Sequence, residues 1–404
     1  MSGARFIARL LNDADLVWME LGEVITLEKG RQLNKELLSK EGLYPAYNGG
    51  ISHSGFTDTF NYTENKTIVS QGGASAGFVN FVTSKFYANA HCYVVLPNCE
   101  RVVDRYVYHL LKMNQESLTG KQHGAGIPAL RTSEILEIPI PIPCPDNSKK
   151  SLEIQAEIVR ILDTFAELSD ELSSELSVRK KQYKYYREKL LSFEDGKAEW
   201  KTLGDITKKW YSGGTPTAGV PAYYENGTIP WLRTQEVKFS DIQSTEVKIT
   251  EAALKNSAAK WIPANCVIIA ISGATAGRSG INKIPLTTNQ HCGCLEIDEK
   301  KALYRYVFHW VSFNYEHIKA LGQGARGDLN SSIIKGFRLP IPYANDPEKS
   351  LAEQARIVAI LDKFDTLTNS LSEGLPGEIE LRQKQYEYYR ELLLSYPMPE
   401  EVGA

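Results

Sequence analysis

Two stretches of the chain carry apolar side chains at every third or fourth position. In the first stretch these residues are Ile158, Ile161, Phe165, Leu168, Leu172, Leu176, Tyr183, Tyr186 and Leu190. In the second they are Leu361, Phe364, Leu367, Leu371, Leu375, Ile379, Tyr386, Tyr389 and Leu393. This spacing puts an apolar seam along one side of an α-helix, and about 40 residues of helix extend roughly 60 Å. The sequence therefore predicts two long helices, whose seams can cover each other in an antiparallel pair.

The two stretches belong to a larger internal repeat. Three segments recur downstream with shifts of 200, 199 and 203 residues: 67–78 at 267–278, 140–165 at 339–364, and 179–193 at 382–396. Two copies of one unit therefore make up the chain. The last shift exceeds the one before it by four residues (203 − 199 = 4), and the second helix contains Gly374, Pro376 and Gly377 at this point. These residues oppose a straight helix, so we expect a kink or a break there.

The rest of each copy has diverged. Residues 23–66 and 205–266 have little in common and are rich in β-branched, aromatic and glycine residues. We expect an α+β fold in which two mixed α/β domains are joined by two long antiparallel helices, with a pseudo-twofold internal repeat. The predicted parts are a first domain, a central helix, a second domain, a C-terminal helix and a tail, at residues 1–145, 146–195, 196–343, 344–398 and 399–404.

The glycine-rich segment 267–280, VIIAISGATAGRSG, suggests a nucleotide-binding loop. A P-loop needs G-x-x-x-x-G-K-[ST], whereas this segment has Ser272 in place of the first glycine and Arg278 in place of the lysine. The first copy has Phe78 at the position of Arg278 and keeps only the small residues. The shared glycines and alanines therefore indicate a tight turn after a strand, where a larger side chain would collide.

The chain offers little other chemistry. Cys92 and Cys292 each follow a histidine, but neighbouring residues on a strand point to opposite faces, so we expect buried cysteines and no metal site. Common catalytic motifs are missing, including the [DNS]-P-P-[YF] motif of amino-methyltransferases, because the chain contains no Pro-Pro pair. Six cysteines without a disulfide pattern, no signal peptide and no long apolar span predict a cytoplasmic protein without a membrane segment. A net charge of −3 does not exclude nucleic acid as a partner.

Several polar residues of the two variable domains suit the reading of base edges in DNA, because Arg and Lys fit guanine and Gln fits adenine. They are Lys29, Arg31, Gln71, Arg233, Gln235, Arg278 and Arg326.

The repeated motifs resemble those of one protein family. They are IPIPCPDNSKKSLEIQAEIVRILDTF, RKKQYKYYR and WKTLGD, accompanied by SGGTP at 212–216 and IPWL at 229–232. The arrangement is similar to the specificity subunit of type I restriction–modification systems, and ELSSELS at 171–177 resembles the short repeats of the type IC branch. The resemblance covers nearly the whole chain.

The resemblance implies a non-catalytic reader of double-stranded DNA. Each target-recognition domain would read half of a split asymmetric site, and the helices would set the spacer and dock two methyltransferase subunits. Cofactors would lie elsewhere, with S-adenosylmethionine on the methyltransferase subunits and ATP and Mg²⁺ on restriction subunits. The helix residues we assign to partner binding are Gln155, Tyr183, Tyr186, Arg187, Gln354, Tyr386, Tyr389 and Arg390.

Two alternatives remain open at this point. A stand-alone DNA methyltransferase or nuclease with an unrecognised active site would modify or cut DNA without partners. A coiled-coil scaffold would show no sequence-dependent DNA binding in its assembled complex.

Overall fold

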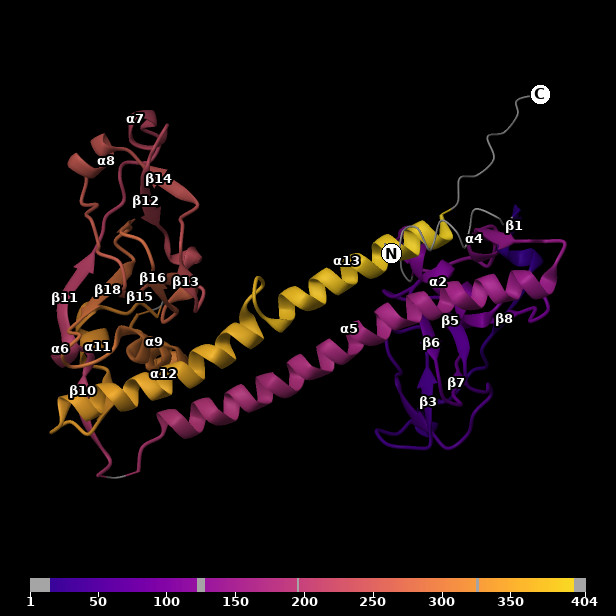
Figure 1. The fold of residues 1–404 in the computed structure, drawn as a ribbon, viewed down its shortest axis with the longest axis horizontal. Helices are drawn as coiled ribbons and strands as arrows, with labels where there is room; N and C mark the ends of the chain where they lie inside the picture. Colours follow the sequence, from indigo (N-terminus) through magenta and orange to yellow (C-terminus); the bar gives the residue numbers. More distant parts are fainter. Residues whose placement is uncertain (1–14, 122–127, 195, 325–326, 396–404) are drawn as a thin grey trace. The chain divides into compact units, whose positions relative to one another are not determined.

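The computed structural model describes residues 15–121, 128–194, 196–324 and 327–395. The chain divides into two compact units, which we call unit 1 (residues 1–174 and 377–404) and unit 2 (residues 175–376). Each unit combines one β-rich region with parts of the long helices (Figure 1). The linear domain boundaries drawn from the sequence stay predictions, because these units follow packing and not chain order.

Unit 1 contains a four-stranded antiparallel sheet in the order β2 (Ile25–Lys29), β8 (Cys92–Pro97), β5 (Lys66–Ser70) and β6 (Val79–Val82). A smaller sheet has the order β4 (Gly55–Thr57), β3 (Tyr44–Tyr47) and β7 (Tyr87–Ala88), and β1 (Leu16–Glu20) pairs with β9 (Pro139–Pro143). The helices are α2 (Asp104–Met113), α3 (Gln115–Gly120) and α4 (Ser133–Leu136), with short 3-10 turns at Leu21–Glu23 and Lys35–Leu37.

Unit 2 repeats this plan and extends it. Its main sheet has five strands, in the order β11 (Thr207–Ser212), β18 (Cys292–Ile297), β15 (Val267–Ala270), β16 (Ser279–Asn282) and β13 (Asp241–Ile242). The other strands are β14 (Val247–Ile249), β12 (Ile229–Leu232) and β17 (Thr287–Thr288) in a small sheet, and β10 (Ala198–Thr202) paired with β19 (Arg338–Pro342). The helices are α6 (Leu203–Ile206), α7 (Pro221–Tyr224), α8 (Glu251–Lys255), α9 (Tyr304–Phe313), α10 (Tyr315–Ala320) and α11 (Ser331–Gly336), with 3-10 turns at Thr234–Glu236 and Gly273–Thr275.

These strands form where the sequence is apolar and β-branched. β15 reads Val-Ile-Ile-Ala and all four of its residues are buried, as expected for a central strand that is covered on both faces. The prediction of mixed α/β domains is confirmed.

The first long helix is confirmed as one element, α5 (Ser148–Leu191), which contains 44 residues. The second is broken into α12 (Pro347–Asn369) and α13 (Leu375–Leu394), so the expected interruption is also confirmed. Gly374 lies in the break, and a side chain there would collide with the carbonyl oxygens of Thr366 and Ser370. Pro376 is accommodated in the first turn of α13, where its missing N–H costs no hydrogen bond.

The apolar seam pairs the helices within each unit. In unit 1 the ring of Phe165 on α5 stacks on Tyr389 of α13, with centroids 4.9 Å apart. In unit 2 the rings of Tyr183 and Tyr186 on α5 stack on Phe364 of α12, at 6.0 and 5.4 Å. The partner numbers fall as the α5 numbers rise, which is the register of an antiparallel pair.

The two units also share their core anchors. Tyr106 and Tyr306 are fully buried, and their hydroxyls donate to the carbonyl oxygens of Pro141 and Pro340, each at 2.8 Å. These bonds fix α2 and α9 to the Pro-rich strands β9 and β19. The repeat detected in the sequence is therefore a repeat of individual atomic contacts.

Candidate nucleic-acid interface

Three predicted DNA-binding residues of unit 1 meet at one end of its four-stranded sheet. Lys29 ends β2 and Arg31 follows it, and both side chains are exposed. Between them, Gly30 lies so close to the next loop that a side chain would collide with the carbonyl oxygen of Asn89. Gly30 N donates to Cys92 O at 2.9 Å and Gln71 N donates to His91 O at 2.8 Å. Lys29, Arg31 and Gln71 therefore surround the first residues of β8.

Unit 2 uses different side chains at the same end of its sheet. Gly213 repeats the close backbone approach of Gly30, in this case to Thr288. The neighbouring side chains are neutral, and the hydroxyl of Thr215 donates to Oε1 of Gln290 at 2.6 Å. The scaffold of this sheet end is thus kept while its charge changes between the copies.

Arg233 and Gln235 follow β12 in unit 2. The guanidinium of Arg233 lies 2.6 Å from a carboxylate oxygen of Glu246 and 3.6 Å from one of Glu236. The amide of Gln235 faces the same guanidinium, with its oxygen 3.0 Å from Nη2 once the amide is oriented to accept. DNA contact by Arg233 stays a prediction, and these carboxylates already neutralise its charge.

Arg278 lies in a different environment, at the end of the glycine-rich turn. Gly273 and Gly277 have φ values of +71° and +85°, and Gly73 and Gly77 have +82° and +88°, which confirms the predicted tight turn in both copies. Among the described residues, the guanidinium of Arg278 has neither a hydrogen bond nor an ion pair. This side chain is therefore available to a ligand, whereas Arg326 lies outside the described residues.

A buried polar cluster, which sequence reasoning missed, holds each domain to a long helix. In unit 1, His109 Nε2 lies 2.8 Å from Asp163 Oδ1, and Arg105 Nε donates to the same carboxylate. Burial alone would raise the pKa of Asp163, but the hydrogen bonds from His109 and Arg105 outweigh it and lower this pKa. Burial lowers the pKa of His109, which favours the neutral imidazole. Unit 2 repeats the cluster with His309, Asp362 and Arg305, so the signal was present in the repeat shifts.

The remaining candidate chemistry is structural. Cys92, Cys292 and Cys294 are buried in strands as predicted, and burial raises the pKa of the Cys92 thiol to about 11. Within the described ranges no three His, Cys, Asp or Glu side chains are grouped so that they could hold a metal ion.

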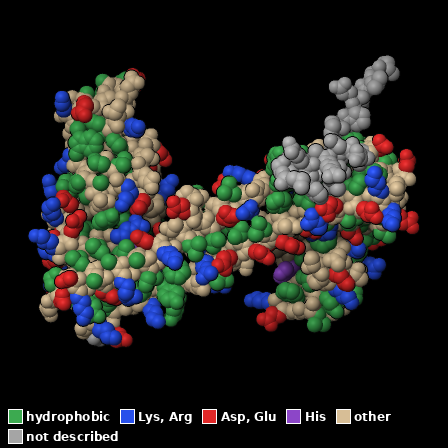
Figure 2. All heavy atoms as spheres, viewed as in Figure 1, with side chains coloured by type: hydrophobic (Ala, Val, Ile, Leu, Met, Phe, Trp, Pro, Cys, Tyr) green, Lys and Arg blue, Asp and Glu red, His purple; other side chains and the backbone are tan. Residues whose placement is uncertain are grey.

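None of the helices described in the structure combines the length and apolar character needed to cross a membrane. Figure 2 shows acidic and basic side chains interspersed over the visible face, so the visible face carries no large, uniformly positive surface.

Comparison with known proteins identifies the family. A family model described as "Type I restriction modification DNA specificity domain" matches residues 15–178 and 197–381. The chain belongs to the type I restriction–modification specificity family. It is 38% identical to the Escherichia coli "Type I restriction enzyme EcoR124I/EcoR124II specificity subunit", and the alignment covers 100% of both chains.

Solved structures show the same fold. The type I system S subunit from M. genitalium matches with a TM-score of 0.68 at 20% identity, over 96% of this chain and 98% of that one. A chain from a study of complex assembly and conformational transition of the type I system matches with a TM-score of 0.52 at 14% identity, over 94% and 97%. The protein is thus a non-catalytic, DNA-recognising specificity subunit, and a stand-alone methyltransferase or nuclease is not favoured. Assignment to the type IC branch stays a prediction.

Most helix residues that we assigned to subunit contacts are buried or half-buried in this specificity subunit, and their role in partner binding stays a prediction. Gln155 and Gln354 are fully buried, and their Oε1 atoms accept from the backbone N–H groups of Val103 and Leu303 at 3.0 and 2.9 Å. The structure thus gives both glutamines an internal role, and no amide atom is left on the surface. The hydroxyl of Tyr386 lies 2.9 Å from His109 Nδ1, and burial raises the pKa of Tyr386 to about 12.

The tyrosine side chains of the two repeated motifs, YKYYR at 183–187 and YEYYR at 386–390, point in two different directions from their helices. Arg187 and Arg390 lie over the rings of Tyr183 and Tyr386, 5.3 and 5.1 Å from their centroids. Tyr186 and Tyr389 stack on the seam, as described above, and Tyr186 keeps 40% of its surface exposed. The middle tyrosines, Tyr185 and Tyr388, are 56% and 59% exposed and were not singled out from the sequence. They occupy equivalent positions and are better placed for a partner than Tyr183 and Tyr386.

Proposed function

We propose that each β-rich domain of this specificity subunit reads one half of a bipartite, asymmetric site on double-stranded DNA. The observation that carries this proposal is the contrast between equivalent scaffolds and unlike surfaces. Both units use the same tyrosine, glutamine and His–Asp–Arg contacts. The charges at the ends of their sheets differ, because unit 1 has Lys29 and Arg31 there, whereas unit 2 has Arg278 at the position of an uncharged residue of unit 1. Two different surfaces on one repeated frame suit two different half-sites.

The helices supply the second part of the proposal. They dock two methyltransferase subunits, one per repeat, and the exposed Tyr185 and Tyr388 support this because they are equivalent positions. S-adenosylmethionine is then bound by the methyltransferase subunits, and ATP and Mg²⁺ by restriction subunits, so this chain binds no cofactor of its own. The assembly acts on DNA in the cytoplasm.

The proposal is tested by mapping methylated bases in a host genome. Cells that express the methyltransferase subunits should show methylation at one two-part motif with a fixed spacer when this chain is present, and none at that motif when it is deleted. Purified chain that methylates or cuts DNA without partners would contradict the proposal and restore the alternative of a stand-alone enzyme.

A deletion in α5 tests whether the helices set the spacer. Removing residues 173–176 from ELSSELS shortens a helix by about 6 Å and turns its downstream part by roughly 40°, because four residues slightly exceed one turn. The apolar seam stays nearly in phase. We expect the same half-sites with a spacer shorter by about one or two base pairs, given a rise of ~3.4 Å per base pair. Methylation at the original spacing would show that the helices only dock subunits.

A further inference from the structure

The main sheets of the two units differ at one edge. In unit 2, β13 adds to β16 as a parallel fifth strand: Ile281 N donates to Ser240 O at 3.3 Å, and Lys283 N donates to Ile242 O at 2.9 Å. The counterpart of β16 in unit 1 is β6, which ends the four-stranded sheet. All four residues of β16 are buried, whereas Asn80 and Phe81 of β6 are partly exposed. Among the residues that the structure describes, the same edge is covered in unit 2 and open in unit 1.

The difference arises from one loop. Strands β12 and β14 of unit 2 are joined by residues 233–246, which is 14 residues (246 − 232 = 14) and includes β13. The equivalent strands β3 and β4 of unit 1 are joined by residues 48–54, which is 7 residues (54 − 47 = 7). Both loops connect an antiparallel pair of strands. The described residues of unit 1 therefore include no strand that covers this sheet edge.

The open edge presents unpaired backbone groups. Because Ser70 N donates to Phe78 O, residues 78, 80 and 82 face β5, and residues 79 and 81 face outward. The outward groups of Val79 are bonded by side chains, with Val79 N donating to Gln115 Oε1 at 3.0 Å and Lys112 Nζ donating to Val79 O at 3.2 Å. In the described part of the chain, no group bonds the outward N–H and C=O of Phe81 or the N–H of Thr83. Such an edge is a template for another strand.

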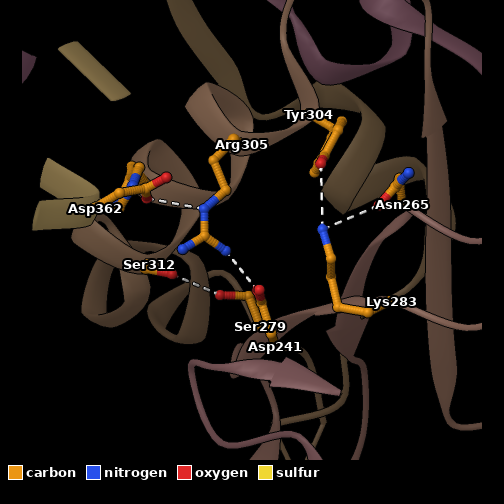
Figure 3. A network of polar contacts seen from close by, with 9 residues as sticks. Asp241, Asn265, Ser279, Lys283, Tyr304, Arg305, Ser312 and Asp362 are labelled. Atoms are coloured by element: carbon orange, nitrogen blue, oxygen red, sulfur yellow. Dashed lines mark hydrogen bonds and ion pairs between the residues drawn. The ribbon is translucent and has the colours of Figure 1, made fainter. Parts of the chain in front are cut away.

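A groove of about 900 Å³ runs beside this edge and contains an arginine that is only partly paired. Arg105 contacts Asp163 through Nε and Nη2. Its equivalent in unit 2, Arg305, donates from Nε to Asp362 and from Nη1 to Asp241 of β13, as Figure 3 shows. Among the described residues Nη1 of Arg105 has no partner. Unit 2 thus contacts this guanidinium nitrogen with its own aspartate, whereas no described residue of unit 1 does so.

The lining of the groove indicates which class of molecule binds there. Asp104, Asp163, Glu167 and Asp170 line it, so a run of backbone phosphates is repelled, whereas a protein segment can bring a single carboxylate to Arg105. Oδ1 of Asp104 is buried and has no hydrogen-bond partner among the described residues. Phe81 and Tyr108 supply apolar walls, with Arg105 lying 4.3 Å from the centroid of the Phe81 ring.

We propose that the β6 edge of unit 1 binds an extended segment of another protein subunit of the restriction–modification complex. The segment runs parallel to β6, as β13 runs parallel to β16, and places an Asp or Glu carboxylate on Nη1 of Arg105. The pattern to be matched is that of residues 240–242, Ser-Asp-Ile, in unit 2. This proposal rests on the proposed function for the existence of partner subunits.

Amide hydrogen exchange tests the proposal with a control inside the same chain. Exchange is measured for residues 79–85 and for the equivalent residues 279–285, in the purified chain and in complexes assembled with methyltransferase subunits and then restriction subunits. The amides of Ile281 and Lys283, which bond to β13, should be protected in every state. The amides of Phe81 and Thr83 should exchange quickly in the free chain and be protected in one of the two complexes.

Other outcomes would overturn the proposal. Exchange at 79–85 that stays fast in both complexes shows that no subunit binds the edge, and if the complexes still methylate a bipartite site the proposed function stands. Protection that appears only with DNA assigns the edge to nucleic acid. Protection of the free chain that grows with its concentration assigns it to a second copy.

A conservative substitution tests the carboxylate contact. Arg105→Lys keeps a positive charge beside Asp163 but loses the planar guanidinium fork. We expect exchange at 79–85 in the protected complex to rise roughly five- to tenfold, the effect of one lost charge-assisted hydrogen bond. The matched variant Arg305→Lys should leave 79–85 unchanged. Unchanged protection in Arg105→Lys would refute the role of Arg105.

Discussion

Unit 1 and unit 2 are built on one frame and differ at their surfaces. The frame is repeated to the level of single bonds, as in the hydroxyl contacts of Tyr106 and Tyr306 at 2.8 Å. The surfaces differ in charge at the ends of the sheets and in the extra strand β13, which has no counterpart among the described residues of unit 1. The comparison teaches that recognition surfaces have diverged on loops while the contacts that hold each domain to the helices stayed fixed.

Truncating the core should give the largest effect and test whether the units are independent. Leu162 and Leu361 are equivalent residues and are fully buried. Leu162→Ala and Leu361→Ala should each lower the free energy of unfolding by about 2–5 kcal/mol, through lost apolar contacts and a cavity. Amide hydrogen exchange of individual segments, measured at increasing denaturant concentration, should show that each substitution lowers the stability of its own unit only. Equal losses of protection in both units for either variant would show that they unfold as one.

Two arginines of unit 2 differ in whether acidic side chains already contact them. Arg278 has no partner in the described structure, whereas Arg233 lies between Glu236 and Glu246. Arg278→Ala should weaken binding of the cognate site by about 1–3 kcal/mol and relax one base position, as for a lost bidentate contact. Arg233→Ala should have the smaller effect on specificity. Binding to a library of sites by the assembled methyltransferase checks both, and unchanged specificity in Arg278→Ala would remove it from the interface.

The sequence predicted some features of the fold and of the candidate site but not others. The long helices, the break near Gly374 and the glycine turns were predicted, because periodicity and backbone limits are local properties. The ion pairs of Arg233 were not, because Glu246 is 13 residues away and only the fold brings it close. Position on a helix shows that Tyr386 lies on the seam, but its bond to His109 involves a residue 277 positions away, and partner binding by Tyr386 stays a prediction. The strand β13 was invisible because two residues give no periodic signal.

A smaller effect is expected when the extra strand of unit 2 is loosened. Asp241→Ala removes the ion pair to Arg305, whose two side chains are 19% and 32% exposed. We expect the free energy of unfolding to fall by about 1 kcal/mol. The amides of Ile281 and Lys283 should exchange faster, as expected for the uncovered edge strand β6. Ser240→Ala is the control, because Ser240 contributes its backbone carbonyl. Equal exchange in the two variants would mean that Asp241 does not hold the strand.

The smallest predicted effect is a pH dependence of unit 1. Burial lowers the pKa of His109 below its unfolded value of about 6.5, so the unfolded chain binds more protons as the pH falls through that value. The stability of unit 1 should therefore decrease from about pH 6.5 downward. Because the pKa of Asp163 is lowered in the folded state, the stabilisation that this carboxylate contributes should persist until about pH 4. Urea unfolding at pH 7.5 and 5.5 measures this. The variant His109→Gln should have lower stability at pH 7.5 and less pH dependence, and an unchanged dependence would exclude His109 as its source.

The central claim is that each unit specifies its own half of the DNA site, and exchanging one domain tests it most directly. Residues 1–140 are replaced by the corresponding domain of another member of the family, and methylated bases are mapped across the genome of a host that carries the same methyltransferase subunits. The account predicts a motif in which one half changes while the other half and the spacer stay the same. A motif in which both halves change, or neither does, would contradict it.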